Sequence, residues 1–250
     1  MIHMNVFIFI LMNIMKIVII RHAEPDYENN TLTEKGFKEA EALGKYYNAS
    51  MFKEIYCSTL NRAKYTCEAI VKGEKEIHFC DWLQEFKPRV FTNNIWHCSW
   101  DYMPSFFDDN EIIQSKDLFE EPVLKEANAK EEYEIVINKF DEVLAKNGYV
   151  RERNSYKVIK ENEDTLLFVC HFGMMSVLLS RLLNIPYTVL AQKTCCYPSG
   201  VTLVVSEERE QGIAQFRMLE FSNIEHLRKE NIEPSFMARF AEVFSSKERH

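Results

Sequence analysis

The amino-acid sequence predicts an α/β fold, a three-layer sandwich in which a mostly parallel central sheet of about six strands is flanked by helices. Short β-branched runs alternate with segments of helical periodicity, the pattern of strands joined by crossover helices. The chain has 250 residues, 46% of them hydrophobic, which is enough to bury one substantial core. We therefore expect one α/β domain that carries a lid-like insertion.

The first predicted elements are a strand and a capped helix. The run Lys16 to Ile20 reads as a buried strand. A loop leads from it to Thr33, whose hydroxyl can cap a helix from about Glu34 to Tyr47. Apolar residues at helical spacing predict the buried stripe of this helix, namely Phe37, Ala40, Leu43 and Tyr47.

A second strand and helix follow. Glu54 to Cys57 predicts a strand, and Ser58 or Thr59 can cap the next helix. This boundary places Arg62 in the first turn of that helix. The inward face of the helix is expected to carry Ala63, Cys67 and Ile70.

The middle of the chain is less regular. Ile77 to Cys80 predicts a third short strand, with Glu85 in the loop just after it. The periodic pattern then dissolves from Lys87 to about Val123, and so long an irregular stretch suggests an insertion, which we place at residues 88–127. Its aromatic residues can enclose a ligand or belong to the core; they are Trp96, Trp100, Tyr102, Phe106 and Phe107.

The second half begins with a helix that should stop near Asn147 and Gly148. One face of this helix is apolar, with Tyr133, Ile137, Phe140 and Leu144. A charged linker from Tyr149 to Asp164 is expected to follow. The run Thr165 to Cys170 is the clearest core strand, and it ends at His171 before an apolar helix that we place at Met174 to Leu183.

Two further strands, Val201 to Val205 and Ala214 to Phe221, flank a polar turn as in a hairpin. We divide the chain into a 1–14 extension, a 15–225 domain and a 226–250 tail. Phe236, Phe240 and Phe244 suggest a docked helix in the tail, although a tail without structure is an equal alternative.

The apolar first twenty residues could be read as a signal peptide or a membrane anchor. They have no basic start, however, and Asn13 and Lys16 interrupt them. The last part also forms the expected first strand, which cleavage would remove. We therefore expect no membrane association and a cytoplasmic protein, for which residues 1–14 are an arm or an upstream-start extension.

The charge and the cysteine content restrict the ligands and the compartment that the protein can be expected to have. The net charge is −8 and the pI about 5.5, so a nucleic-acid partner is not expected and any anionic ligand needs local positive charge. Seven cysteines without paired spacing fit a reducing compartment and are expected to be buried thiols. Neither His97 with Cys98 nor His78 with Cys80 has the spacing of a zinc site, so no metal is expected.

Histidine and arginine residues follow three of the predicted strands. Arg21 and His22 come after the first strand, Arg62 follows the second, and His171 ends the clearest strand. In open α/β sheets ligands bind at the carboxyl ends of the strands, where loops and helix N-termini converge. These side chains are therefore candidates for one anion site.

These residues lie in motifs that resemble those of the histidine phosphatase superfamily, the phosphoglycerate mutase-like group. The motifs occur in the family's order, as Arg21-His22-Ala23-Glu24-Pro25, Leu32-Thr33-Glu34-Lys35-Gly36, Ser58-Thr59-Leu60-Asn61-Arg62-Ala63, Leu83-Gln84-Glu85 and His171-Phe172-Gly173. The resemblance covers residues 15 to about 205, and the stretch from 88 to 150 contributes little.

The resemblance implies phosphoryl transfer on a small phosphorylated substrate, and we expect no metal or other cofactor. The weak match to mutases at Glu28 and the divergent stretch from 88 to 150 favour a phosphomonoester hydrolase. It implies that His22 is the nucleophile, that Arg21 and Arg62 clamp the phosphate, that His171 completes the pocket and that Glu85 is the proton donor. Substrate contact would also come from the backbone after His171, at Phe172. Glu24 is the competing carboxylate, and it can equally serve only to hold its loop.

The chemistry fits these residue types. A neutral imidazole can attack phosphorus and divide one difficult hydrolysis into two easier steps. Guanidinium groups beside His22 disfavour its protonation and match the phosphoryl oxygens in geometry. A carboxyl group near a phosphate dianion has a raised pKa and can supply the proton to the leaving oxygen.

The sequence departs from the family pattern in a few places. Ala23 and Phe172 stand where members often have glycine, and Glu28, followed by Asn29, stands where mutases usually have asparagine. We assign no phosphate-binding role to Asn29.

Several alternatives stay open. A mutase would use the same phosphohistidine, and a silent member would bind a phosphorylated ligand without turnover. A cysteine phosphatase is disfavoured because Cys57 and Arg62 are separated by four residues instead of five. Neither the physiological ester nor a homodimer can be decided from the sequence.

Overall fold

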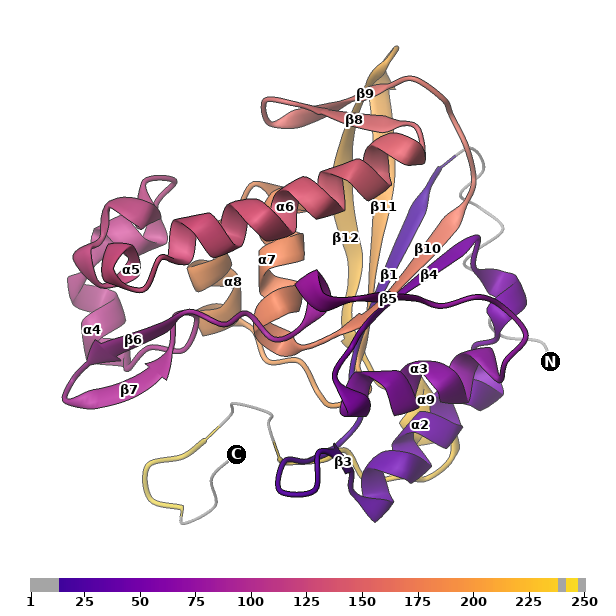
Figure 1. Ribbon diagram of the computed structural model, residues 1–250, viewed down its shortest axis with the longest axis horizontal. Helices are drawn as coiled ribbons and strands as arrows, with labels where there is room; N and C mark the ends of the chain where they lie inside the picture. The colour runs from indigo at the N-terminus through magenta and orange to yellow at the C-terminus, as the bar shows by residue number, and fades with distance from the viewer. Residues whose placement is uncertain (1–13, 238–241, 247–250) are drawn as a thin grey trace.

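The centre of the molecule is an eight-stranded sheet in a computed structural model that describes residues 14–237 and 242–246 (Figure 1). Across the sheet the strands are β5 (His78–Cys80), β4 (Glu54–Ser58), β10 (Thr165–Cys170), β1 (Lys16–Arg21), β11 (Val201–Glu210), β12 (Ile213–Asn223), β9 (Ser155–Val158) and β8 (Tyr149–Glu152). Helices cover both faces, which confirms the predicted α/β class.

The sheet is mixed, however, and has more strands than predicted. β5, β4, β10 and β1 are parallel to one another, whereas every pairing from β1 through β11, β12 and β9 to β8 is antiparallel. The two extra strands come from the segment that we expected to be a charged linker. There Tyr149 and Tyr156 are buried, and Arg153 adopts a left-handed φ of 53° at the turn.

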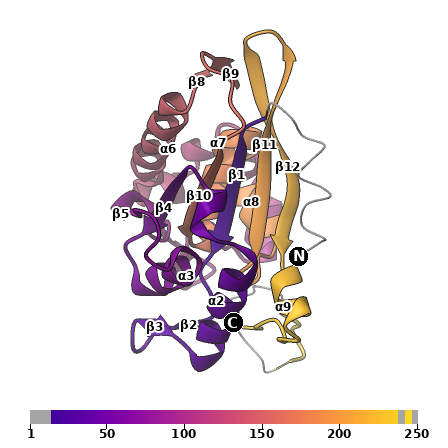
Figure 2. The ribbon, with the colours of Figure 1, turned by 90° about the vertical axis from the view of Figure 1, so that its right-hand side faces the viewer.

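Alternate residues of β1 point to opposite helical layers. Ile17 and Ile19 join the core under α6 (Ala129–Lys146), α7 (Phe172–Leu183) and α8 (Tyr187–Lys193). Val18 and Ile20 pack on the other face with α2 (Glu34–Tyr46) and α3 (Asn61–Val71). Figure 2 shows the β11–β12 hairpin projecting beyond the remaining strands of the sheet.

Helix α2 begins as predicted, but its buried face differs. Thr33 Oγ1 accepts a hydrogen bond from the Gly36 backbone N–H at 2.9 Å, which is the expected cap. Phe37 was predicted to be buried and is 47% exposed. The reason is close backbone packing: a Cβ on Gly36 would lie 2.2 Å from the Glu24 carbonyl oxygen, so the glycine side faces inward.

The start of α3 also differs from the prediction. Leu60 occupies the cap position, and no side chain caps the helix. Ser58 and Thr59, the expected caps, have other partners, namely His171 and Asp81 respectively.

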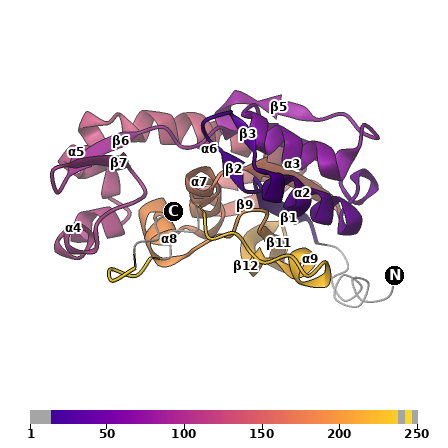
Figure 3. The same cartoon turned by 90° about the horizontal axis from the view of Figure 1, so that it is seen from below.

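The insertion contains regular elements that sequence periodicity did not predict. They are the hairpin of β6 (Arg89–Thr92) and β7 (Ile95–Cys98), then α4 (Pro104–Asp109), η3 (Glu111–Gln114), η4 (Leu118–Glu120) and α5 (Pro122–Glu126). Trp100, Tyr102 and Phe107 are buried in the main core, whereas Trp96 is 65% exposed. Figure 3 shows the hairpin and α4 on one side of α7, with α2 and α3 on the other.

The remaining elements are short. They are β2 (Pro25–Asp26), β3 (Thr31–Leu32), η1 (Ala49–Met51), η2 (Asp81–Leu83) and α9 (Glu225–Lys229). Residues 1–13 lie outside the described residues, and so does Phe240 of the expected tail helix. Phe244 is fully exposed. No helix among residues 14–237 and 242–246 is long and apolar enough to cross a membrane.

Candidate active site

Two buried histidines meet at the carboxyl end of the parallel strands. β1 and β10 are adjacent, with Arg21 opposite Cys170, so the residues that follow each strand lie side by side. His22 and His171 have ring centroids 4.9 Å apart and are 1% and 0% exposed. The sheet therefore brings together residues separated by 149 positions in the chain.

The protonation state of His22 can be read from its partners. Nδ1 lies 2.7 Å from the Ala23 carbonyl oxygen, which can only accept, so Nδ1 carries the proton. Burial and the positive charges of Arg21 and Arg62 hold the pKa of His22 well below its usual value of 6.5. A neutral ring with its proton on Nδ1 has a free electron pair on Nε2.

Two arginines flank this pair. Arg21 donates to the Cys196 carbonyl oxygen at 2.5 Å, and its guanidinium lies 5.5 Å from the centre of the Phe172 ring. Arg62 comes from the first turn of α3, as predicted, and lies 5.4 Å from the centre of the Tyr27 ring. The charges of both arginines reach His22 and His171, which places four of the predicted residues in one cluster.

Glu85 lies at the same cluster. Its Oε1 accepts hydrogen bonds from the backbone N–H groups of Phe86 and Met174, both at 2.9 Å. Burial nevertheless raises the pKa of Glu85, against the lowering effect of these two bonds and of the site arginines. A carboxyl group whose neutral form is favoured is suited to donate a proton.

The Glu24 carboxylate binds residues outside the histidine and arginine cluster. Its carboxylate accepts hydrogen bonds from the hydroxyls of Thr33, at 2.7 Å, and Ser235. It therefore fastens the loop after His22 to the C-terminal segment. Asn29 likewise contacts Asp26 through its side chain at an exposed position.

The Phe172 side chain is a buried ring, and the backbone contact with substrate at this residue stays a prediction. Phe172 is 1% exposed, backs Arg21 and meets Trp100 edge to face at 5.7 Å between ring centroids. Trp100 also covers Gly173, where a Cβ would lie 2.2 Å from the indole Nε1. The insertion thus packs directly on the first turn of α7.

Sequence reasoning missed two residues of this site. Tyr27, in the loop that follows His22, has the Arg62 guanidinium over its ring. Ser58 is fully buried, and its Oγ lies 2.8 Å from His171 Nε2. The one signal for Ser58 was its position at the end of a strand, and we predicted from that position that it caps the next helix.

The cysteines do not favour a thiol nucleophile. All seven cysteines are free, although Cys80, Cys98 and Cys195 are only partly buried and so differ from the prediction. Burial raises the pKa of the Cys57 thiol, which opposes a thiolate nucleophile. Among the described residues, no three His, Cys, Asp or Glu side chains are grouped to hold a metal ion.

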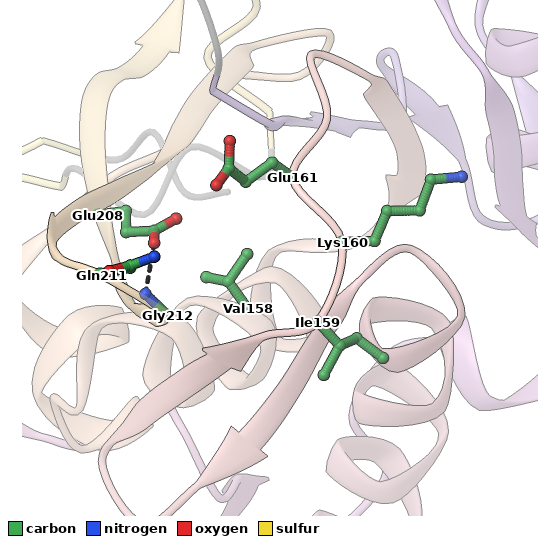
Figure 4. A pocket seen from close by; sticks show the side chains of 7 residues that line it. All are labelled: Val158, Ile159, Lys160, Glu161, Glu208, Gln211 and Gly212. Carbon is green, nitrogen blue, oxygen red and sulfur yellow. Dashed lines mark hydrogen bonds between the residues drawn. The ribbon is translucent and has the colours of Figure 1, made fainter.

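Of two pockets on the surface, one lies away from the histidine and arginine cluster. One of about 170 Å³ lies at the β9 and β11–β12 turns and is lined by Val158, Ile159, Lys160, Glu161, Glu208, Gln211 and Gly212 (Figure 4). None of the clustered histidines or arginines belongs to it. Another, of about 70 Å³, adjoins the cluster through Phe172 and Trp100.

The carboxyl edge of the α/β sheet thus gathers two histidines, two arginines and a carboxyl group. The chain belongs to the histidine phosphatase superfamily (branch 1), whose family model matches residues 17–218. A search of curated proteins gives no match.

Solved structures share the fold at low sequence identity. Phosphoserine phosphatase from Entamoeba histolytica, in complex with 3-phosphoglyceric acid, is 18% identical, with 85% of this chain and 99% of that chain covered and a TM-score of 0.57. A mycobacterial glucosyl-3-phosphoglycerate phosphatase is 13% identical, with 84% and 99% covered and a TM-score of 0.51. The Shigella flexneri α-ribazole phosphatase is 16% identical, with 84% and 96% covered and a TM-score of 0.50.

Proposed function

We propose that the protein is a metal-independent phosphomonoester hydrolase that acts through a phosphohistidine on His22. The observation that carries the proposal is the hydrogen bond from His22 Nδ1 to the Ala23 carbonyl oxygen, together with the lowered pKa of the ring. These leave Nε2 unprotonated at neutral pH and able to act as a nucleophile.

In the first step, His22 Nε2 forms a bond to phosphorus while the bond from phosphorus to the leaving oxygen breaks. Glu85 gives its proton to that oxygen, so the alcohol leaves neutral. Arg21, Arg62 and His171 stabilise the charge on the non-bridging oxygens.

In the second step, the Glu85 carboxylate accepts a proton from a water molecule that attacks the phosphohistidine. The bond from nitrogen to phosphorus breaks, inorganic phosphate leaves, and His22 and Glu85 return to their starting protonation states. No redox partner is required.

The substrate we propose is a small phosphorylated molecule. The structural relatives whose names state a ligand bind phosphoserine or 3-phosphoglyceric acid, which supports this class. A mutase would use the same residues, and a silent member would keep the binding but lose turnover. Both are outcomes of the test below.

The test is phosphate release from an aryl phosphate ester in the presence of EDTA. We expect wild type to turn over and His22→Ala to lose turnover. His78→Ala is the matched control, because His78 lies on neighbouring β5, packed against Tyr56 at 5.1 Å and outside the cluster. Wild type inactive on a panel of esters would overturn the hydrolase; isomerised phosphoglycerate would then identify a mutase, and phosphate binding alone a silent member.

A further inference from the structure

Ser58 and His171 form a buried pair at the ends of two adjacent strands. β4 lies parallel to β10 with Cys57 opposite Val169, so the last residue of β4 reaches the residue after β10. Ser58 Oγ lies 2.8 Å from His171 Nε2, and both residues are 0% exposed. The other ring nitrogen, Nδ1, is buried and has no hydrogen-bond partner among the described residues.

The hydrogen bonds around Ser58 Oγ indicate which ring nitrogen carries the proton. The Leu60 backbone N–H donates to Ser58 Oγ at 3.3 Å. If His171 Nε2 donated as well, the hydroxyl proton would have no acceptor among the described residues. If the hydroxyl donates to Nε2 instead, the hydroxyl, the Leu60 N–H and Nε2 are all paired. The ring proton then sits on Nδ1, the one polar atom of this group without a partner among the described residues.

We propose that Ser58 is a positioning residue that holds His171 in the tautomer with the proton on Nδ1, so that this N–H donates to a phosphoryl oxygen. The inference rests on the proposed function. The opposite tautomer would turn an electron pair toward an anionic oxygen, which is repulsive. Burial and the positive charges of Arg62 and Arg21 lower the pKa of His171, so its ring stays neutral and the tautomer decides whether it can donate.

The direct test is nitrogen NMR of ligand-free wild type labelled with ¹⁵N-histidine, near neutral pH. Long-range correlations distinguish the two tautomers of a neutral ring. We expect the His171 signal to show protonated Nδ1 and unprotonated Nε2. The reverse assignment would overturn the inference, whether or not the protein is a phosphohistidine enzyme, because this measurement needs no turnover.

Variants connect the tautomer to the reaction. Ser58→Ala is expected to give a mixture of tautomers and to lower kcat about 10- to 100-fold, the range found when the hydrogen-bond partner that fixes the tautomer of a metal-bound histidine is lost. Its effect on kcat should exceed that on KM, because the bond strengthens as charge moves to the oxygens. Ser58→Thr keeps the hydroxyl and should restore both the tautomer and most of the rate.

Ser180→Ala is the matched control. Ser180 is buried on α7 and pairs with the Tyr133 hydroxyl at 3.2 Å, two turns from the start of the helix. This variant should keep both the His171 signal and kcat. A Ser58→Ala protein with the wild-type tautomer and wild-type kcat would overturn the inference, while loss of turnover in His22→Ala would still support the proposed function.

Discussion

The carboxylate of Glu85 accepts a hydrogen bond from the Met174 backbone N–H at 2.9 Å, across 89 positions of the chain. Met174 lies in the first turn of α7, the helix that begins directly after His171. The candidate acid and the second histidine are therefore fixed to one rigid element. This contact fixes the distance between Glu85 and the candidate phosphate pocket. It leaves Glu85 Oε2 without a hydrogen bond to the described residues.

The first prediction concerns Glu85→Gln. The amide keeps an acceptor for Met174 but cannot donate a proton as an acid does, so kcat should fall about 10²- to 10³-fold for an alkyl phosphate. The loss should be much smaller for a nitrophenyl phosphate, whose leaving group needs no proton. Glu24→Gln serves as the control and should change the rate little; a uniform loss for both esters would argue against an acid role.

The second prediction concerns pH. Glu85 must be protonated in the first step, so kcat/KM should decline as pH rises through the pKa of Glu85. Because that pKa is raised from 4.5, the enzyme should stay active at pH values above 4.5. His22 must be neutral, and its lowered pKa keeps the acid limb well below 6.5. Steady-state rates across pH should give a bell whose basic limb lies above pH 4.5 and whose acid limb lies well below 6.5. An acid limb near 6.5 would contradict the account.

The third prediction concerns stability. Glu39 is 0% exposed, accepts the Glu24 backbone N–H at 2.9 Å, and burial raises its pKa from 4.5 to about 7. Because the folded state holds this proton more tightly, the contribution is full below 4.5 and is lost as pH rises to about 7. Glu39→Gln should remove that loss, on the order of 3 kcal/mol above pH 7.

Denaturant unfolding of wild type and Glu39→Gln at several pH values checks this. The two should converge near pH 4.5 and diverge above pH 7, with the variant the more stable. Glu41→Gln, an exposed position on the same helix, is the control. A constant difference at all pH values would exclude the buried carboxyl as its source.

The fourth prediction concerns the contact between the insertion and the site. In Gly173→Ala the new Cβ would lie 2.2 Å from Trp100 Nε1, so the indole must move. Overpacking of this kind costs about 1–3 kcal/mol. Thermal unfolding should show that Trp100→Leu relieves the cost, with the double variant more stable than the sum of the single changes predicts. Strictly additive changes in stability would show that the two residues are not energetically coupled.

The parts of the fold that followed from sequence were those with a single clear periodicity. The continuous apolar run of β10 and the Thr33 cap predicted β10 and the start of α2 correctly. The prediction that Phe37 is buried was wrong because α2 packs through Gly36. Its packing partner, the Glu24 carbonyl, cannot be predicted from the spacing of apolar residues. The prediction missed the β8–β9 hairpin because its apolar alternation is broken: Val150 is exposed, and Arg151, opposite Tyr156, is half-buried.

The candidate site was predictable where the chemistry stands in short motifs at strand ends. His22, Arg62 and His171 are of this kind, and the sheet brings them together. Ser58 was not predictable in the same way, since its partner is 113 positions away and depends on the pairing of β4 with β10. The same holds for Trp100, whose contact with Gly173 depends on how the insertion folds back.

The most direct test of the central claim is to trap the phosphoryl group on the protein. Wild type is mixed with a phosphate ester, quenched in alkali, which preserves phosphohistidine, and mapped by peptide mass spectrometry. We predict one added phosphoryl group on His22, absent after acid treatment and absent in His22→Ala. Turnover without a trapped intermediate, or a phosphoryl group on another residue, would contradict the account.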